Sequence, residues 1–220
     1  MLRTSMTKNS LLLGLFALIT TLLIASTHLS TKDKIAEAQR RAEQKALLEL
    51  VPLSRHNNSM LDETLEVGSE ALLLHLKNKK KIYVARQNGR PIAAILPAIA
   101  PDGYSGAIEI IVGINLDGSI AGVRTLSHKE TPGLGDKIDV NKSDWVLSFN
   151  GKSLNNPKPS LWAVKKDKGA FDQFTGATIT PRAVTKSVYQ SLLYFDQNKE
   201  RIFSVTKSHI IDNYEVNNGG

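Results

Sequence analysis

The sequence predicts an α+β fold, in which an N-terminal transmembrane helix and a helical stalk precede an antiparallel sheet with packed helices. Three observations predict it. An uncharged aliphatic run occupies residues 10–27, two strand–turn–strand patterns lie between residues 82 and 124, and an amphipathic helical pattern follows Thr180. Strands and helices that are segregated along a chain favour an antiparallel sheet with helices on it.

The N-terminal run is long enough, with some flanking sequence, to cross a hydrocarbon core of about 30 Å. We therefore expect an uncleaved membrane anchor over residues 1–31. The alternative is a signal peptide in which Arg3 and Lys8 form the basic start, but no clear Ala-x-Ala cleavage pattern follows. Either interpretation exports the rest of the chain, although lysines just after the span weaken the charge asymmetry.

Residues 32–52 are rich in strong helix formers and stop at Pro52, which predicts the helical stalk. We expect the globular domain to cover residues 53–205 and a tail to follow over 206–220. Within the domain, residues 70–76 fit either a strand or a short helix.

Two hairpins form the core of the prediction. Strands over 82–86 and 91–96 flank an Asn-Gly turn, and strands over 108–114 and 120–124 flank Asp117-Gly118. A helix over 145–149 and a strand over 161–164 are expected next. The last helix has Thr180 as its cap and Pro181 at its first position. Its apolar face consists of Val184, Val188, Ser191, Leu192 and Phe195.

The composition excludes several kinds of function. The chain has no cysteine, so disulfides, thiolate metal sites, iron–sulfur ligation and a cysteine nucleophile are ruled out. The formal net charge is +7, but the basic residues are scattered without interleaved aromatic residues, so nucleic acid is not an expected partner. The basic run at 77–81 is interpreted as a solvated hairpin end, with contact to anionic lipid headgroups as the alternative.

Two stretches have residue patterns that the packing of strands and helices alone does not require. Residues 171–182 place small residues before a helix N-terminus, whose free amides and partial positive charge suit a phosphate. Spacing alone favours a simpler interpretation, a capped turn in which Thr178 is a passive loop residue. Residues 127–138 fit either two successive glycine turns or a backbone that a flat ligand can approach closely.

Three motifs carry a specific resemblance. Asp172-Gln-Phe-Thr-Gly-Ala-Thr178 resembles the Asp-x-x-Ser/Thr-Gly-Ala-Thr flavinylation motif of FMN-binding domains in Rnf (Rsx) and sodium-pumping NADH:quinone oxidoreductase complexes. His128-Lys-Glu-Thr-Pro-Gly-Leu-Gly135 resembles the second signature of these domains. Residues 100–106 resemble the corresponding loop of Rnf G subunits, and the Gly-Leu-Trp pattern usual in quinone-reductase C subunits is absent there.

The resemblance implies a covalent cofactor. FMN would be joined by a phosphoester to Thr178, in a Mg²⁺-dependent reaction in which a separate flavin transferase uses FAD. It implies no catalytic residue and no metal site in this chain. The further flavin contacts that it implies are Tyr104, Glu130, Thr131, Gly133, Leu134, Thr175, Gly176 and Ala177.

The resemblance also implies a role and a place. The chain would relay electrons as the G subunit of an Rnf/Rsx complex, in which ferredoxin- and NAD-linked electron flow is coupled to ion translocation. Its partners would be the other subunits, the transferase and membrane lipid. It would be a single-pass protein of a bacterial inner membrane with a periplasmic domain. The alternatives are a C-type subunit of the quinone reductase and a non-flavinylated, membrane-tethered scaffold.

Overall fold

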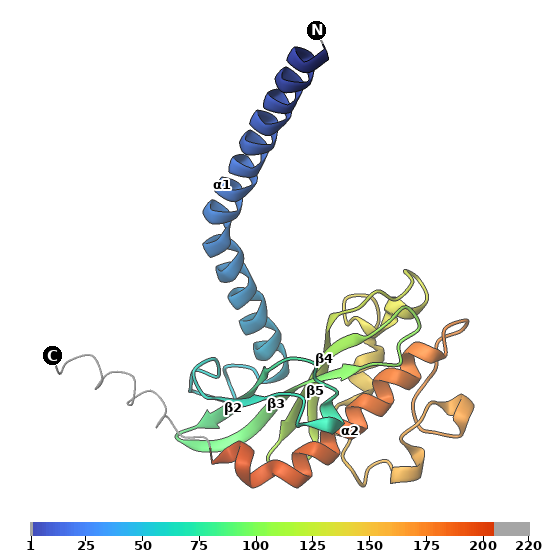
Figure 1. The fold of residues 1–220 in the computed structure, drawn as a ribbon. Helices are drawn as coiled ribbons and strands as arrows, with labels where there is room; N and C mark the ends of the chain where they lie inside the picture. The colour runs from blue at the N-terminus through green and yellow to red at the C-terminus, as the bar shows by residue number, and fades with distance from the viewer. Residues whose placement is uncertain (1, 205–220) are drawn as a thin grey trace, which may run out of the picture. The chain divides into compact units, whose positions relative to one another are not determined.

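The computed structural model of the chain describes residues 2–204, and its longest element is helix α1, Leu2–Leu50 (Figure 1). Within α1, Asn9–Lys32 has a mean hydropathy of 2.1 and is long and apolar enough to cross a membrane. A signal sequence can share this length and apolar composition. The predicted span and stalk are thus parts of one uninterrupted helix. It ends two residues before Pro52, which cannot continue a helix. The predicted tail over 206–220 lies outside the described residues.

The chain divides into two compact units between Lys45 and Ala46, so the last turn of α1 belongs to the second unit. That unit contains a five-stranded antiparallel sheet in the order β1-β2-β3-β4-β5. The strands are β1 (Thr64–Val67), β2 (Lys80–Gln87), β3 (Arg90–Ala100), β4 (Ile108–Asn115) and β5 (Ile120–Ser127). The sheet and both predicted hairpins are therefore confirmed, and the edge strand β1 is an addition.

The first hairpin turns where the sequence predicted. Asn88 and Gly89 have φ angles of 51° and 78°, so both central residues are left-handed. This is the backbone that a two-residue hairpin turn requires, and asparagine and glycine adopt it at the lowest cost. The turn residues therefore fix the register in which β2 and β3 pair.

Both faces of the sheet are covered. Helix α2, Ile179–Phe203, packs along one face (Figure 1), and the predicted apolar stripe of α2 is buried. The other face is covered by the end of α1, where Leu47, Leu50 and Val51 join a second buried cluster with residues of β2, β3 and β4. Gly113 and Gly122 pair across β4 and β5, and a Cβ on either would lie within 3.3 Å of the Leu50 side chain.

One local prediction is wrong, and the structure gives the helix type of two others. The strand expected over 161–164 does not form: Leu161 ends the 3-10 helix η4 (Pro159–Leu161), and Val164 forms an isolated bridge with Phe171. Trp162, with φ −76° and ψ 60°, departs from the extended backbone that a strand needs. The helix expected over 145–149 is the 3-10 helix η3 (Asp144–Phe149), and the ambiguous 70–76 segment holds η1 (Leu72–Leu74). Two further 3-10 segments, η2 (Gly135–Ile138) and η5 (Lys165–Asp167), lie in loops.

Candidate functional site

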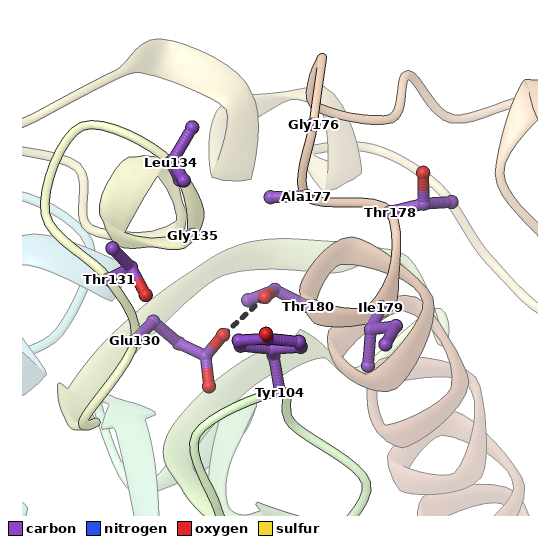
Figure 2. Close-up of a pocket in the computed structure, with 10 residues that line it drawn as sticks. All are labelled: Tyr104, Glu130, Thr131, Leu134, Gly135, Gly176, Ala177, Thr178, Ile179 and Thr180. Carbon is purple, nitrogen blue, oxygen red and sulfur yellow. Dashed lines mark hydrogen bonds between the residues drawn. The ribbon is translucent and has the colours of Figure 1, made fainter.

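A cavity of about 220 Å³ lies where three loops meet the start of α2 (Figure 2). The loop after β3 supplies one wall, the loop after β5 a second, and the segment leading into α2 a third. The lining residues are Tyr104, Glu130, Thr131, Leu134, Gly135, Gly176, Ala177, Thr178, Ile179 and Thr180. The two signature loops of the sequence, far apart along the chain, therefore form one site.

Most of the site residues expected from the sequence line this cavity, but Gly133 and Thr175 do not. Gly135, Ile179 and Thr180 line it without having been expected as contacts. Gly135 belonged to a motif already singled out, and Thr180 was assigned to a helix cap. No signal in a single sequence marks Ile179, because an apolar residue at a helix start is ordinary.

Thr178 is the N-cap residue of α2, with φ −77° and ψ −26°, and its side chain forms no capping hydrogen bond. The residue is half-buried, and its hydroxyl is not used by the helix. The first amides of a helix have no carbonyl partner within it and carry partial positive charge. An unused hydroxyl thus lies beside donors that suit a phosphate.

The prediction that Thr180 caps α2 is wrong, because the helix begins one residue before it. The Thr180 side chain is fully buried and its hydroxyl donates to the Glu130 carboxylate. Figure 2 shows this bond crossing from the α2 turn to the loop after β5. The hydroxyl therefore closes the cavity wall and does not cap the helix.

The segment before Thr178 is supported by aromatic side chains. Trp145 Nε1 donates to the Asp172 carbonyl oxygen at 2.8 Å, and the Trp145 ring meets Phe174 edge-on at 5.1 Å between centroids. Lys165 forms an ion pair with Asp172 at 2.6 Å. Gly176 has φ +79°, a left-handed backbone that favours glycine. The motif therefore has a defined backbone path into the helix.

Basic side chains surround the start of α2. Arg182 donates two hydrogen bonds to Asp167, at 2.5 and 2.6 Å, and these bonds hold the pKa of Asp167 below its ordinary value. Lys186 donates to Asp102 at 2.9 Å and lowers the pKa of that carboxyl in the same way. The exposed lysines Lys166 and Lys168, beside Lys165 and its pair with Asp172, add positive charge. The local balance favours an anionic ligand.

The mouth of the cavity is apolar. Tyr104, Leu134 and Ile179 all line it and remain exposed, at 69%, 43% and 45%. Large apolar side chains are usually buried, so three of them around one opening suit a flat, apolar ring. A ligand with an aromatic ring at one end and a phosphate at the other matches this mouth together with the α2 N-terminus.

Comparison with known proteins gives the family. The chain is 52% identical to the G subunit of the ion-translocating oxidoreductase complex of Pseudomonas aeruginosa (strain UCBPP-PA14), over 92% of this chain and 94% of that protein. The G subunit of Pseudoalteromonas atlantica is also 52% identical, over 90% and 92%, and that of Shewanella oneidensis 49%, over 90% and 93%. The chain belongs to this family.

Two family models agree with that assignment. Residues 1–50 match the RnfG N-terminal region, and residues 103–193 match the FMN-binding domain. Every residue that lines the cavity falls inside the second match. Among solved structures, the C subunit of the Na⁺-translocating NADH-quinone reductase from Parabacteroides distasonis is similar, with a TM-score of 0.43 and 23% identity over 59% of this chain and 65% of that one.

The chain therefore carries an FMN-binding domain, and the cavity fits FMN. The exposed apolar side chains at its mouth suit the ring system, and the unused Thr178 hydroxyl with the α2 amides suits the phosphate. Membership of the G-subunit family and the apolar N-terminal helix together associate the chain with a membrane.

Proposed function

We propose that the chain is the electron-transfer G subunit of an Rnf/Rsx-type complex and carries FMN in phosphoester linkage to Thr178. The observation that carries this proposal is that Thr178 lines the cavity and that its hydroxyl forms no capping bond. A residue whose side chain the helix needed would be a poor attachment point, because modification would remove a cap worth about 0.5–2 kcal/mol.

Attachment requires a partner enzyme. In the proposed reaction the Thr178 oxygen forms a bond to the FMN phosphorus of FAD, the pyrophosphate bond breaks, AMP leaves and the hydroxyl proton is released. A flavin transferase with Mg²⁺ would activate the hydroxyl and polarise the phosphoryl group. This chain then needs only an accessible hydroxyl on a fixed backbone, which the aromatic support for Asp172 and Phe174 supplies.

The bound flavin would supply the redox chemistry, and the protein would supply binding and orientation. The α2 amides and the basic side chains near Arg182 would hold the phosphate. Tyr104, Leu134 and Ile179 would enclose the ring and exclude water from it. With no separate substrate site proposed, the chain acts as a relay between other redox groups.

Its surroundings follow from the same proposal. The chain would be anchored once in a bacterial inner membrane by residues 1–31, with a stalk over 32–52, a periplasmic domain over 53–205 and a tail over 206–220. Its partners would be the other subunits of the complex, membrane lipid around the span and the transferase. Electron flow would be linked to ferredoxin and NAD and coupled to ion movement.

The alternatives make different predictions. A non-flavinylated scaffold would explain the anchor and the core, but it gives no use to the unbonded Thr178 hydroxyl or to the cavity. A C-type subunit of the quinone reductase shares the attachment chemistry, but the chain is about half identical to G subunits over nearly their whole length.

The test is the intact mass of denatured protein that is co-produced with a flavin transferase. We expect an FMN-sized adduct on the native chain and on part of the Thr178→Ser protein, because serine keeps the hydroxyl. Thr178→Val should carry none and should remain folded, since a half-buried loop side chain without a capping hydrogen bond contributes within about 0.5 kcal/mol.

Thr175→Ala is the matched control, because Thr175 is exposed, three residues away and outside the cavity. Thr180→Ala is unsuitable, since it also removes the buried bond to Glu130. If Thr178→Val carries the adduct and Thr175→Ala does not, the attachment residue is Thr175 and the assignment to Thr178 is wrong. A native chain that never gains the adduct would leave the scaffold as the better proposal.

A further inference from the structure

Glu130 places a buried carboxylate in the wall of the cavity. The residue is 4% exposed, and none of the ion pairs among the described residues includes it. A carboxylate that leaves water without a cationic partner costs free energy, so such residues are uncommon in plain cores. Its position beside a ligand cavity suggests a purpose there.

The carboxylate joins all three segments of the site. Its Oε1 accepts a hydrogen bond from the Ser105 amide at 2.9 Å, in the loop that carries Tyr104. Its Oε2 accepts one from the Thr180 hydroxyl on α2 (Figure 2). Both donors are neutral dipoles, so they satisfy the oxygens without cancelling the charge. In a partly dry cavity an uncancelled charge acts over several ångströms.

The backbone around Glu130 leaves space for this side chain at two points. A Cβ added at Gly135 would lie 2.8 Å from Glu130 Oε2 and 2.9 Å from Thr180 Oγ1, and one added at Gly103 would lie 3.0 Å from Glu130 Oε1. These distances are too short for ordinary contacts. Gly135 therefore accommodates the carboxylate and its bond to Thr180, whereas a Cβ at Gly103 would first meet the Gly106 carbonyl oxygen, at 2.2 Å.

We infer that Glu130 is a positioning residue that also sets the reduction potential of the flavin: its bonds hold the three segments together, and its unpaired charge opposes the arrival of electrons in the cavity. This inference rests on the proposed function. Electrons bring negative charge to the ring, and a fixed negative charge in a cavity of low polarity makes that addition less favourable. The purely structural alternative is that Glu130 only ties the segments together.

Two variants separate charge from structure. Glu130→Gln keeps the length of the side chain and can still accept from Ser105 and bond to Thr180, but it has no charge. Thr180→Val keeps the charge and the shape but removes one of the two donors that satisfy the carboxylate. If charge sets the potential, the first variant raises it and the second leaves it unchanged or lowers it. If the bonds alone matter, Glu130→Gln, which keeps them, leaves the potential unchanged, and only Thr180→Val, which removes one, shifts it.

The measurement is a spectroelectrochemical titration of the full-length, flavinylated chain in detergent, after the intact mass has confirmed the adduct. We expect Glu130→Gln to shift the reduction equilibrium at least tenfold toward the reduced form, which is about 30 mV for a two-electron couple. An unchanged or lower potential in this variant, or a rise in both variants, overturns the inference. Circular dichroism and thermal melting confirm that each variant is folded.

The outcomes remain distinct from those of the proposed function. If the native chain gains no adduct, the proposed function and this inference fail together, before any titration. If the adduct forms and Glu130→Gln behaves like the native chain, only the inference fails. If Glu130→Gln does not fold, Thr180→Val decides alone: a raised potential overturns the charge effect, and an unchanged or lowered one supports it.

Discussion

Gly135 shows how a glycine can serve a neighbouring side chain instead of a ligand. The sequence suggested that the glycines of the loop after β5 let a flat ligand approach the backbone. At Gly135, however, the missing Cβ leaves room for the bond between Glu130 and Thr180. At Gly133, where φ is +77°, nothing lies within 4 Å of an added Cβ, and the constraint is the backbone angle.

We therefore predict different effects for alanine at the two positions. Gly135→Ala should destabilise the domain by about 1–3 kcal/mol through overpacking and should weaken flavin binding, because the wall of the cavity must shift. Gly133→Ala should cost about 1–2 kcal/mol of backbone strain while leaving the cavity wall in place. Urea unfolding and the flavin absorption spectrum of both variants test this. A normal spectrum in Gly135→Ala with a disturbed one in Gly133→Ala would reverse the assignment.

At the residue scale, the sequence was informative where a motif is local. The segment ending at Thr178 is continuous, so its residues could be recognised without a structure. The bond between Glu130 and Thr180 joins residues fifty apart, and no single-sequence pattern encodes such a pairing. Thr180 also fits a helix cap by type, and only the position of the first helical residue excludes that role.

At the element scale, one buried ion pair connects several parts of the fold away from the site. Arg86 on β2 donates to Glu63 at 2.6 Å and to the Phe203 carbonyl oxygen, at the end of α2, at 2.9 Å. Both side chains of the ion pair are at most 10% exposed. The pair therefore holds the C-terminal end of α2 against the sheet.

Removing one partner of that pair should be costly. We predict that Glu63→Ala destabilises the domain by about 3–5 kcal/mol, because it removes one side of a buried ion pair that Arg86 makes at 2.6 Å. Glu66→Ala is the matched control, since its 3.6 Å pair with Lys79 is exposed and contributes within about 1 kcal/mol. Urea midpoints measure both. Equal, small losses in the two variants would show that the buried pair has little role.

The elements were predictable where apolar residues recur at the spacing of a strand or a helix. The two hairpins have turn residues and apolar runs that indicate strands, and α2 has a stripe at helical spacing; all three were found. β1 has only four residues, too few for a period to show. Of the 3-10 segments, η3 was predicted as a helix, and η1 lies where a strand or a short helix was left open. The segments η2, η4 and η5 were missed because three or four residues are too few for a period to show.

At the scale of the whole molecule, orientation in the membrane decides which partners the domain can meet. We predict that everything after the span lies outside the cytoplasm, because Arg3 and Lys8 precede the apolar segment. A phosphatase reporter fused after Ser204, just beyond α2, should be active, and a reporter that works only in the cytoplasm should be silent. The opposite pair of signals would contradict the orientation.

Two sets of charge substitutions, each made in the reporter fusion, test which residues control the orientation. Neutral residues at Arg3 and Lys8 should weaken the orientation, because basic residues act within about 15–20 residues of a span. The same change across Lys77–Lys81 should not, because that run begins well beyond this distance from Lys32, the end of the span. Comparable effects of the two changes would argue against control by the residues beside the span.

The glycine pair on β4 and β5 has a practical consequence. Gly113 and Gly122 leave room in the sheet for the side chain of Leu50, the last residue of α1, which belongs to one buried cluster with Leu47 and Val51. A soluble fragment that begins at residue 53 would lack these three side chains. It would expose the apolar face of the sheet to the solvent, which favours aggregation. The boundary for expression therefore belongs upstream of Ala46, inside α1.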